Sequence, residues 1–375
     1  MTNDFLARNQ TRLADFVRMS QCAGSRSDFV QGGGGNTSCK LDKQLMAIKA
    51  SGFRLDQITE NQAYAVLDYQ LLRDFYQKTD PAGLADVEKE GSAQAKSAIK
   101  PVEGLPSLRP SVEAGFHSLL ETYVLHTHPV YANLAACSAE GPALAAAALA
   151  DMPAGFASVP YINPGAQLTF AIDQARKQAA AAQGKLPAVI LMQNHGLIVT
   201  ADDIETCLAW HEEANRRIAA AYHVSSLDWP VISLEAASPA APGAEAWCSA
   251  TGWLHDRLLD TAWDLDFFTG QPLYPDQLVF LGGQVGIAEK GSLNQFLMDK
   301  KPLPDKCTLF RETGEVYYQC GQREARTLEE TLCAILFIVR TIRQAGMTVC
   351  TMSEAGRSFI DGWESEKYRK NLAAK

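Results

Sequence analysis

The sequence lacks several patterns that mark common classes of protein. Its nine cysteines show no Cys-x-x-Cys spacing, which argues against a structural zinc site and predicts reduced thiols in a cytoplasm. The longest strongly apolar run, residues 332–339, is too short to cross a bilayer, and the first residues lack the basic and apolar regions of a signal peptide. A net charge of −9 disfavours nucleic acid as a partner. We therefore expect a cytoplasmic protein with neither a membrane nor a nucleic acid as partner.

Two nucleotide-binding motifs are also missing. No Gly-x-Gly-x-x-Gly occurs, so a Rossmann domain is not expected, and the glycines at 32–35 are not followed by the Gly-Lys-Ser/Thr of a P-loop. With 375 residues, 47% hydrophobic and 21% charged, the chain is predicted to be soluble, globular and large enough for two domains.

Three of the seven histidines occupy positions that suit a metal. His126 and His128 lie in an apolar run that Pro129 ends, which predicts a buried strand with both imidazoles on one face and Thr127 on the other. His195 lies in an Asn-His-Gly turn between two apolar runs, at the predicted end of a sheet. Three imidazoles with an open position are typical of catalytic zinc, with Mn²⁺, Fe²⁺ or Co²⁺ as substitutes. The alternative is that each histidine is hydrogen-bonded in a pocket of its own.

Glu113 is the candidate general acid or base. Pro110 and Ser111 predict the start of a helix, which places Glu113 in its first turn on the same face as His117. The helix dipole alone favours a carboxylate there, so a structural role is the alternative. Close to a metal, a partly desolvated carboxylate can be tuned toward neutral pH for proton transfer.

A glycine-rich run, Gly32 to Gly35, precedes Asn36 and Thr37. Backbone amides at Gly35 and its neighbours can approach an anion closely, and the side chains of Asn36 and Thr37 add donors. This run predicts a cradle for a phosphate or carboxylate. A flexible turn without a ligand is the alternative.

Five motifs follow one another along the chain, and in this order they resemble the class II aldolase/adducin family over residues 30–225. The resemblance implies a three-layer α/β/α domain with a mostly antiparallel central sheet, assembled as a homotetramer with active sites between subunits. The motifs are Gly-Gly-Asn-Thr-Ser at 34–38, Ser51-Gly52, Pro110-Ser111-Val112-Glu113 with His117, His126-Thr127-His128-Pro129 and Asn194-His195-Gly196-Leu197.

The resemblance also implies roles for residues at the matching positions. Glu113 would be the acid or base, and Tyr222 is a candidate for protonating the leaving aldehyde. The zinc ligands would be His126, His128 and His195. The substrate phosphate would be held by Asn36, Ser51, Gly52 and Ser111.

One position departs from the pattern of the phosphate-binding aldolases, which have two serines before the Glu. This chain has Ser111-Val112, so one phosphate donor is missing. The substrate is then unphosphorylated or is held differently, for example by Arg109 or Lys49. An arginine fork suits a carboxylate and a phosphate equally well.

The predicted function is zinc-dependent aldol cleavage of a ketose, with a ketose 1-phosphate giving dihydroxyacetone phosphate and an aldehyde through a zinc-stabilised enediolate. A sugar-acid decarboxylase, a pentulose-phosphate epimerase and a dehydratase would use the same metal site. An adducin-like scaffold is a further alternative, although Glu113 and all three histidines are present.

Outside these motifs, the sequence predicts a first domain at 1–234, a linker rich in Pro and Ala at 235–246, and a smaller α/β domain of unknown role at 247–375. The last part loosely resembles the end of the aldolase half of bifunctional rhamnulose-phosphate aldolase/lactaldehyde dehydrogenase proteins. Residues 79–107 are predicted to be a mobile insertion, which is an unstructured surface loop or, as the alternative, a lid over the site. The other expected elements are a helix at 202–223 with Asp202 as N-cap, strands at 274–281 and 316–318, and a helix at 327–344.

Overall fold

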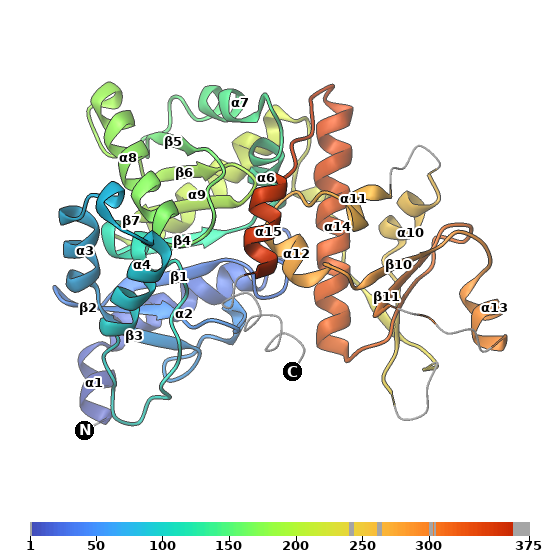
Figure 1. Cartoon of the computed structure of the whole chain (residues 1–375), viewed down its shortest axis with the longest axis horizontal. Helices are drawn as coiled ribbons and strands as arrows, with labels where there is room; N and C mark the ends of the chain where they lie inside the picture. The colour runs from blue at the N-terminus through green and yellow to red at the C-terminus, as the bar shows by residue number, and fades with distance from the viewer. Residues whose placement is uncertain (1, 240–243, 261–264, 300–302, 304, 363–375) are drawn as a thin grey trace.

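The computed structural model describes residues 2–239, 244–260, 265–299, 303 and 305–362. Figure 1 shows a larger α/β part, formed by the N-terminal segments, and a smaller part with its own sheet. The long helix α14 (Gln322–Gln344) stands between them.

The larger part contains one seven-stranded sheet with the strand order β3-β2-β1-β4-β7-β6-β5. Neighbouring strands are antiparallel in every pair except β5 with β6. This confirms the predicted, mostly antiparallel sheet. The strands are β1 (Asn36–Lys40), β2 (Leu45–Lys49), β3 (Tyr64–Asp68), β4 (Tyr123–Thr127), β5 (Phe156–Val159), β6 (Val189–Met192) and β7 (Gly196–Ala201).

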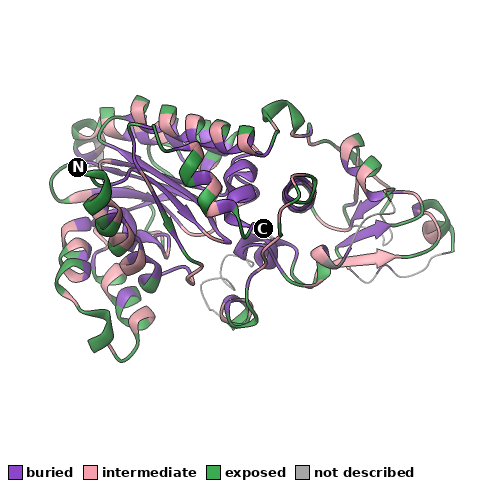
Figure 2. Cartoon of the chain, turned by 90° about the horizontal axis from the view of Figure 1, so that it is seen from above, coloured by how far each residue is buried: buried purple, intermediate pink, exposed green. Residues whose placement is uncertain are grey.

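Helices cover both faces of this sheet because its strands carry apolar side chains on both sides. In β4, Leu125 joins the core shared with α2, α6 and α9, whereas Val124 joins the core shared with α5 and α8. Figure 2 shows the buried strands between helices whose outer surfaces are exposed, which confirms the three-layer α/β/α architecture. The helices of this part are α1 (Thr2–Arg8), α2 (Gln10–Gly24), α3 (Tyr69–Lys78), α4 (Val87–Ser97), α5 (Ala114–Leu119), α6 (Val130–Ala136), α7 (Gly141–Ala148), α8 (Ala166–Gln183) and α9 (Ile204–Ala221), with short 3-10 turns η1 (Leu55–Gln57), η2 (Pro81–Gly83) and η3 (Ser226–Asp228).

The smaller part is built on a five-stranded sheet with the order β10-β11-β12-β9-β8, antiparallel except between β10 and β11. The strand predicted at 316–318 is β12, and the helix predicted at 327–344 is α14. Its strands are β8 (Leu234–Ala236), β9 (Trp247–Ser249), β10 (Val285–Ala288), β11 (Cys307–Phe310) and β12 (Val316–Tyr318), and its other helices are α10 (Gly252–Leu258), α11 (Asp266–Thr269), α12 (Pro275–Phe280), α13 (Leu293–Met298) and α15 (Glu354–Gly362).

The predicted linker at 235–246 begins inside β8, because Glu235 and Ala236 pair with β9. Within this predicted linker, residues 240–243 lie outside the described residues. The boundary at 234 stays a prediction. One hydrophobic core nevertheless runs through both parts: Phe337 of α14 lies 6.0 Å from the Tyr131 ring and 5.6 Å from the Trp229 ring, measured between centroids.

The strand predicted at 274–281 is wrong, because this segment forms helix α12. Tyr274 is extended and Pro275 occupies the first helical turn, where its fixed φ suits a helix start. Every residue of α12 is buried. A short apolar run that is buried on all sides has no period that separates a strand from a helix.

Two helices begin at residues other than those predicted. The helix expected from Pro110 begins at Ala114, so that Glu113 is the N-cap residue rather than part of the first turn. The N-cap of α9 is Asp203, whose carboxylate accepts a hydrogen bond from the first turn, and not Asp202. In both cases the helix starts later than the capping pattern indicated.

Residues 79–107 are not an unstructured insertion throughout, since they contain α4. The Glu88 carboxylate of α4 accepts hydrogen bonds from the backbone N–H groups of Ala166 and Gln167, both at 2.9 Å, at the start of α8. A carboxylate at the positive end of a helix dipole is stabilising, so α4 is attached to the α/β layer. Among the described residues, no helix is long and apolar enough to span a membrane.

Candidate metal centre

The three histidines predicted as metal ligands meet at one end of the large sheet. His126 is in β4, His128 follows that strand, and His195 lies in the turn between β6 and β7. The Nε2 atoms of His126 and His128 are 3.2 Å apart, and one nitrogen from each of the three rings lies within 4.8 Å of the others. Thr127 points to the opposite face, where its hydroxyl is hydrogen-bonded to His211 at 2.6 Å. All three rings are buried.

Hydrogen bonds to the outer ring nitrogens orient two of these imidazoles. His126 Nδ1 donates to the Leu197 carbonyl at 3.0 Å, and His128 Nδ1 donates to the Asp276 carboxylate at 2.5 Å. This assignment leaves lone pairs on the two Nε2 atoms that face each other, which is unfavourable unless a cation lies between them. Burial lowers the pKa of His195 to about 3, so this ring also offers a lone pair. Such nitrogens are suitable ligands for zinc and related divalent metals.

Glu113 lies against the same nitrogen atoms. Its Oε2 is 3.4 Å from His126 Nε2, and its Oε1 is 3.3 Å from His195 Nε2. Within the described structure, Glu113 Oε1 is a buried atom with no hydrogen-bond partner. Leaving a buried polar atom unsatisfied costs about 1–3 kcal/mol, and more for a charged group, which a bound cation would offset. Three imidazole nitrogens and one carboxylate therefore fit a divalent metal.

Asn36 connects Glu113 to the sheet. Its Nδ2 donates to Glu113 Oε2 at 2.6 Å and to Ser111 Oγ at 3.0 Å, and its Oδ1 accepts from His117 Nε2. His117 Nδ1 then accepts a hydrogen bond of 2.7 Å from the Ser38 hydroxyl. Burial holds the pKa of His117 well below its usual value, so this ring is neutral. The amide predicted to bind the substrate's anion is thus engaged in holding Glu113.

A small cavity of about 30 Å³ opens beside the histidines. Lys49 is the one Lys or Arg side chain among the described residues that line it, and Val112 lies in the same wall. The predicted site residues that line it are Gly35, Asn36, Ser51, Gly52, Ser111, Glu113, His128 and His195.

Three predicted residues lie elsewhere. Thr37 faces the other side of β1, where its hydroxyl is hydrogen-bonded to Ser20 at 2.7 Å. Arg109 lines a separate cavity of about 460 Å³ beside α4, and its carbonyl accepts from the Ser51 N–H at 2.9 Å. Tyr222 follows the end of α9, and its hydroxyl is hydrogen-bonded to the Ser138 hydroxyl. It is not among the described residues that line the cavity beside the histidines. Strand alternation accounts for Thr37, since its neighbour Asn36 faces the site.

The sequence model of the class II aldolase and adducin N-terminal domain matches residues 15–222, more than half of the chain. This chain belongs to the class II aldolase and adducin family. The match includes the three histidines and Glu113, and it ends before α12. Among curated proteins, no sequence matches the chain.

Several solved structures are similar to this class II aldolase family member. The N-terminal class II aldolase domain of a conserved protein from Thermoplasma acidophilum is 21% identical, over 54% of this chain and 90% of that one, with a TM-score of 0.44. An L-fuculose 1-phosphate aldolase is 19% identical, over 56% and 83%, with a TM-score of 0.36. A sugar-phosphate aldolase from Thermotoga maritima is 14% identical, over 58% and 97%, with a TM-score of 0.41.

In this family member, the glycine-rich run allows close packing around the histidines. A Cβ on Gly34 would collide with the Asp276 carboxylate and would lie 3.0 Å from His128 Nδ1. A Cβ on Gly35 would lie 2.6 Å from the His126 carbonyl oxygen, and Gly35 has a φ of +63° that favours glycine. Steric room for neighbouring segments is therefore one reason for these glycines, beside the predicted binding of an anion.

Sequence reasoning missed Asp276. It follows all the family motifs and lies in the run that was predicted to be a strand, yet it lines the metal-side cavity and binds His128. One signal was present: Asp276 is the single acidic residue in the apolar run at 273–281. A carboxylate in a buried run requires a partner, because burying it unpaired is costly.

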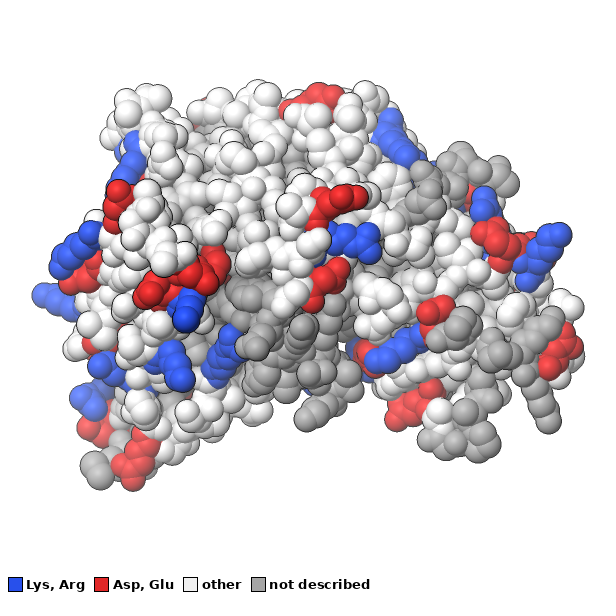
Figure 3. Space-filling view, in the orientation of Figure 1, with Lys and Arg blue, Asp and Glu red and all other residues white. Residues whose placement is uncertain are grey.

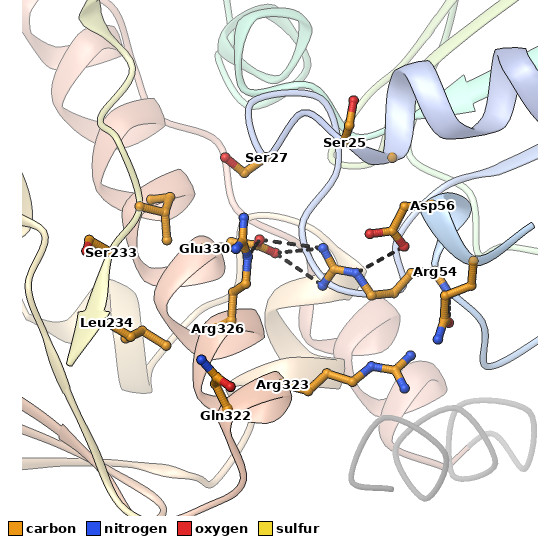
Figure 4. Close-up of a pocket in the computed structure, with 13 residues that line it drawn as sticks. Ser25, Ser27, Arg54, Asp56, Ser233, Leu234, Gln322, Arg323, Arg326 and Glu330 are labelled. Carbon is orange, nitrogen blue, oxygen red and sulfur yellow. Dashed lines mark hydrogen bonds and ion pairs between the residues drawn. The ribbon is translucent and has the colours of Figure 1, made fainter. Parts of the chain in front are cut away.

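A larger cavity of about 730 Å³ lies apart from the histidines, between the end of α2 and the first turns of α14. Figure 4 shows Arg54 and Arg326 directed at the Glu330 carboxylate, with N–O distances of 3.4 and 2.9 Å. Glu330 also accepts a hydrogen bond of 3.1 Å from the backbone N–H of Gly32. Helix α14 is thereby attached to the glycine-rich run.

Proposed function

We propose that this chain is a metal-dependent class II aldolase that cleaves a ketose, with a ketose 1-phosphate as the substrate and dihydroxyacetone phosphate and an aldehyde as the products. The supporting observation is the convergence of His126, His128, His195 and Glu113 on one point beside a lined cavity. The family membership agrees with this assignment. An adducin-like scaffold would have no need for such a buried donor set.

A bound divalent cation would act as a Lewis acid toward the negative charge that develops on substrate oxygens as the carbon-carbon bond breaks. Cleavage takes one proton from the hydroxyl that becomes the aldehyde carbonyl and adds one to the carbon of the ketone fragment, so no proton is gained or lost overall. Glu113 would deliver the second of these protons and regain one from the first through solvent. Its carboxylate is suited to this because Asn36 holds Oε2, while Oε1 has no protein hydrogen-bond partner within the described residues. His117 stays neutral and keeps the Asn36 amide oriented, so the relay fixes the position of the carboxylate.

The substrate's anionic group would lie between Lys49 and the serines at 51 and 111. Lys49 comes from the end of β2 and is almost fully buried, which strengthens its attraction to an anion. Val112 supplies an apolar wall where the phosphate-binding pattern has a second serine. This arrangement offers a phosphate one charge and the Ser111 hydroxyl, together with the Ser51 hydroxyl if it turns away from the Pro110 carbonyl, to which it donates at 3.0 Å.

The small number of donors for an anion in this cavity favours a second candidate function. A carboxylate needs fewer donors than a phosphate, so Lys49 and Ser111 beside Val112 would also suit a sugar acid. A sugar-acid decarboxylase would use the same metal site, as would a pentulose-phosphate epimerase or dehydratase. Activity assays with the substrate of each reaction are needed to distinguish them.

The proposal includes zinc as the metal, a homotetramer as the assembly and the cytoplasm as the location. Zinc is supported by the all-imidazole set with a carboxylate beside it. The tetramer and the location rest on the family resemblance and on cysteine usage. Light scattering that gave a monomer would contradict the tetramer.

The test is elemental analysis of the purified protein, followed on the same sample by a screen of ketose 1-phosphates for dihydroxyacetone phosphate. We expect about one zinc per chain and cleavage of at least one ketose 1-phosphate. Stoichiometric metal without cleavage, but with turnover of a sugar acid, would replace the aldolase with the decarboxylase. No metal would contradict both enzymatic proposals.

A further inference from the structure

Residues 273–276 of the C-terminal part, at the start of α12, contact the metal centre through Asp276 and the Leu273 carbonyl. We propose that this segment is a component of the centre, with Asp276 as the residue that positions His128. This inference rests on the proposed metal site. It gives the C-terminal part a role that the family match, which ends at 222, does not include.

The first contact is the bond from His128 Nδ1 to Asp276 Oδ2. The two atoms are 2.5 Å apart, His128 is 3% exposed and Asp276 is fully buried. A carboxylate on Nδ1 keeps the proton on that nitrogen and directs Nε2 toward the metal position. Gly34 leaves space for this contact, because a side chain there would occupy the position of the Asp276 carboxylate.

The second contact holds the turn that carries His195. Asn194 precedes this histidine with a φ of +49°, a conformation that asparagine tolerates better than most residues. Its Nδ2 donates to the carbonyls of Leu273 and Cys350, both at 2.9 Å, and its backbone N–H donates to the Ala136 carbonyl at 2.9 Å. The turn is therefore fastened to the C-terminal part by a side chain that has two acceptors there.

The third contact holds the glycine-rich run. Glu330 of α14 accepts from the Gly32 N–H, and Arg54 and Arg326 hold the Glu330 carboxylate in place (Figure 4). Three elements of the centre are thus supported from beyond the family domain: the His128 ring, the His195 turn and the glycine-rich run. Asp276 is the one of these supports that acts directly on a proposed metal ligand.

The experiment measures zinc affinity by competition with a chromophoric chelator, using the full chain and the variants Asp276→Asn and Asp276→Ala. Zinc affinity should fall about 10-fold to 100-fold in Asp276→Ala. It should fall less in Asp276→Asn, whose amide oxygen still accepts from Nδ1. The visible spectrum of the Co²⁺-loaded protein should change in Asp276→Ala, because the His128 ring loses the acceptor that orients it. A matched control is Glu329→Gln, a buried carboxylate of α14 that is bonded to Ser249 and Tyr318.

Thermal unfolding of the metal-free proteins separates positioning from a merely structural role. Weaker zinc binding in folded Asp276→Ala, with unchanged binding in Glu329→Gln, supports the inference. Unchanged zinc affinity in Asp276→Ala, with or without lower stability, overturns it. If Asp276→Ala does not fold, the Asp276→Asn result decides, because this variant keeps the shape of the side chain.

Failure of the underlying function gives a different result. A wild-type chain that binds no zinc contradicts the metal centre itself, and the inference with it. A wild-type chain that binds zinc, together with variants that bind it equally well, contradicts the inference alone. Asn194→Ala provides a second check, and we expect it to weaken zinc binding because the His195 turn loses both of its C-terminal acceptors.

Discussion

The family-matched part of the chain and the C-terminal part contribute to the same centre in different ways. The first supplies the groups that would touch metal and substrate: three histidines, Glu113 and Lys49. The second supplies groups that hold those in place, with Asp276 and Glu330 as the clearest cases. Reactive groups can thus follow a family pattern while their supports come from a segment that lies outside it.

The largest effect is expected from the substitution of a proposed metal ligand. His128→Ala should abolish stoichiometric metal and activity together, because it removes one of three imidazole ligands. Elemental analysis and an activity assay on the same sample test this. His255→Ala, which changes a histidine that is 47% exposed in the C-terminal part, is the control. Full metal content in His128→Ala would remove His128 from the site.

Glu113→Gln should separate chemistry from metal binding. The three imidazoles remain, so metal should be retained, whereas turnover should fall by about 10² to 10⁴ because the proton carrier is lost. Turnover number and metal content are measured in parallel. Glu103→Gln, at an exposed position, should behave as the wild type. Normal turnover in Glu113→Gln would make Glu113 structural.

Phe337→Ala tests whether the two parts unfold as one unit. Its ring packs between Tyr131 and Trp229 in the shared core, so its loss should lower the free energy of unfolding by about 3–5 kcal/mol. Denaturant unfolding followed by circular dichroism and by zinc release should give coincident curves at a lower midpoint. Leu227→Ala, with a side chain that is 93% exposed, should change the free energy of unfolding by no more than about 0.5 kcal/mol. Separate transitions would show that the C-terminal part unfolds independently.

The smallest effect is expected from Lys49→Met. Losing a charged hydrogen bond to the substrate's anion, worth about 1.5–3 kcal/mol, should lower kcat/KM about 10-fold to 100-fold, mainly through KM. Lys43→Met, at an exposed position in the turn between β1 and β2, is the control. An unchanged KM for every anionic substrate would place the anion elsewhere.

The geometry of the histidines follows from the sequence because it depends on local periodicity. Side chains two apart on a strand share a face, so the meeting of His126 and His128, and the opposite direction of Thr127, need no tertiary information. The same rule separates Asn36 from Thr37, which the glycine-rich motif had grouped together. A short motif identifies candidate site residues, and strand alternation then shows which of them can face the site.

The remaining contacts could not be read from local patterns. The bond between His128 and Asp276 spans 148 positions of sequence, and that between Gly32 and Glu330 spans 298. Contacts of such separation depend on where α12 and α14 pack, which single-sequence periodicity does not specify. The wrong prediction of a strand at 274–281 is related, because a segment that is buried on all sides shows no periodic alternation of apolar and polar residues.

Gly34 carries a consequence for finding relatives of this chain. Because the Asp276 carboxylate occupies the space that a side chain at 34 would need, the two positions are coupled by volume. In homologues that keep a C-terminal segment against the histidines, glycine should persist at position 34 together with an acid at position 276. Homologues that consist of the aldolase domain alone are free of this constraint. The joint occurrence of glycine at position 34 and an acid at position 276 would therefore identify the homologues in which a C-terminal segment packs against the histidines.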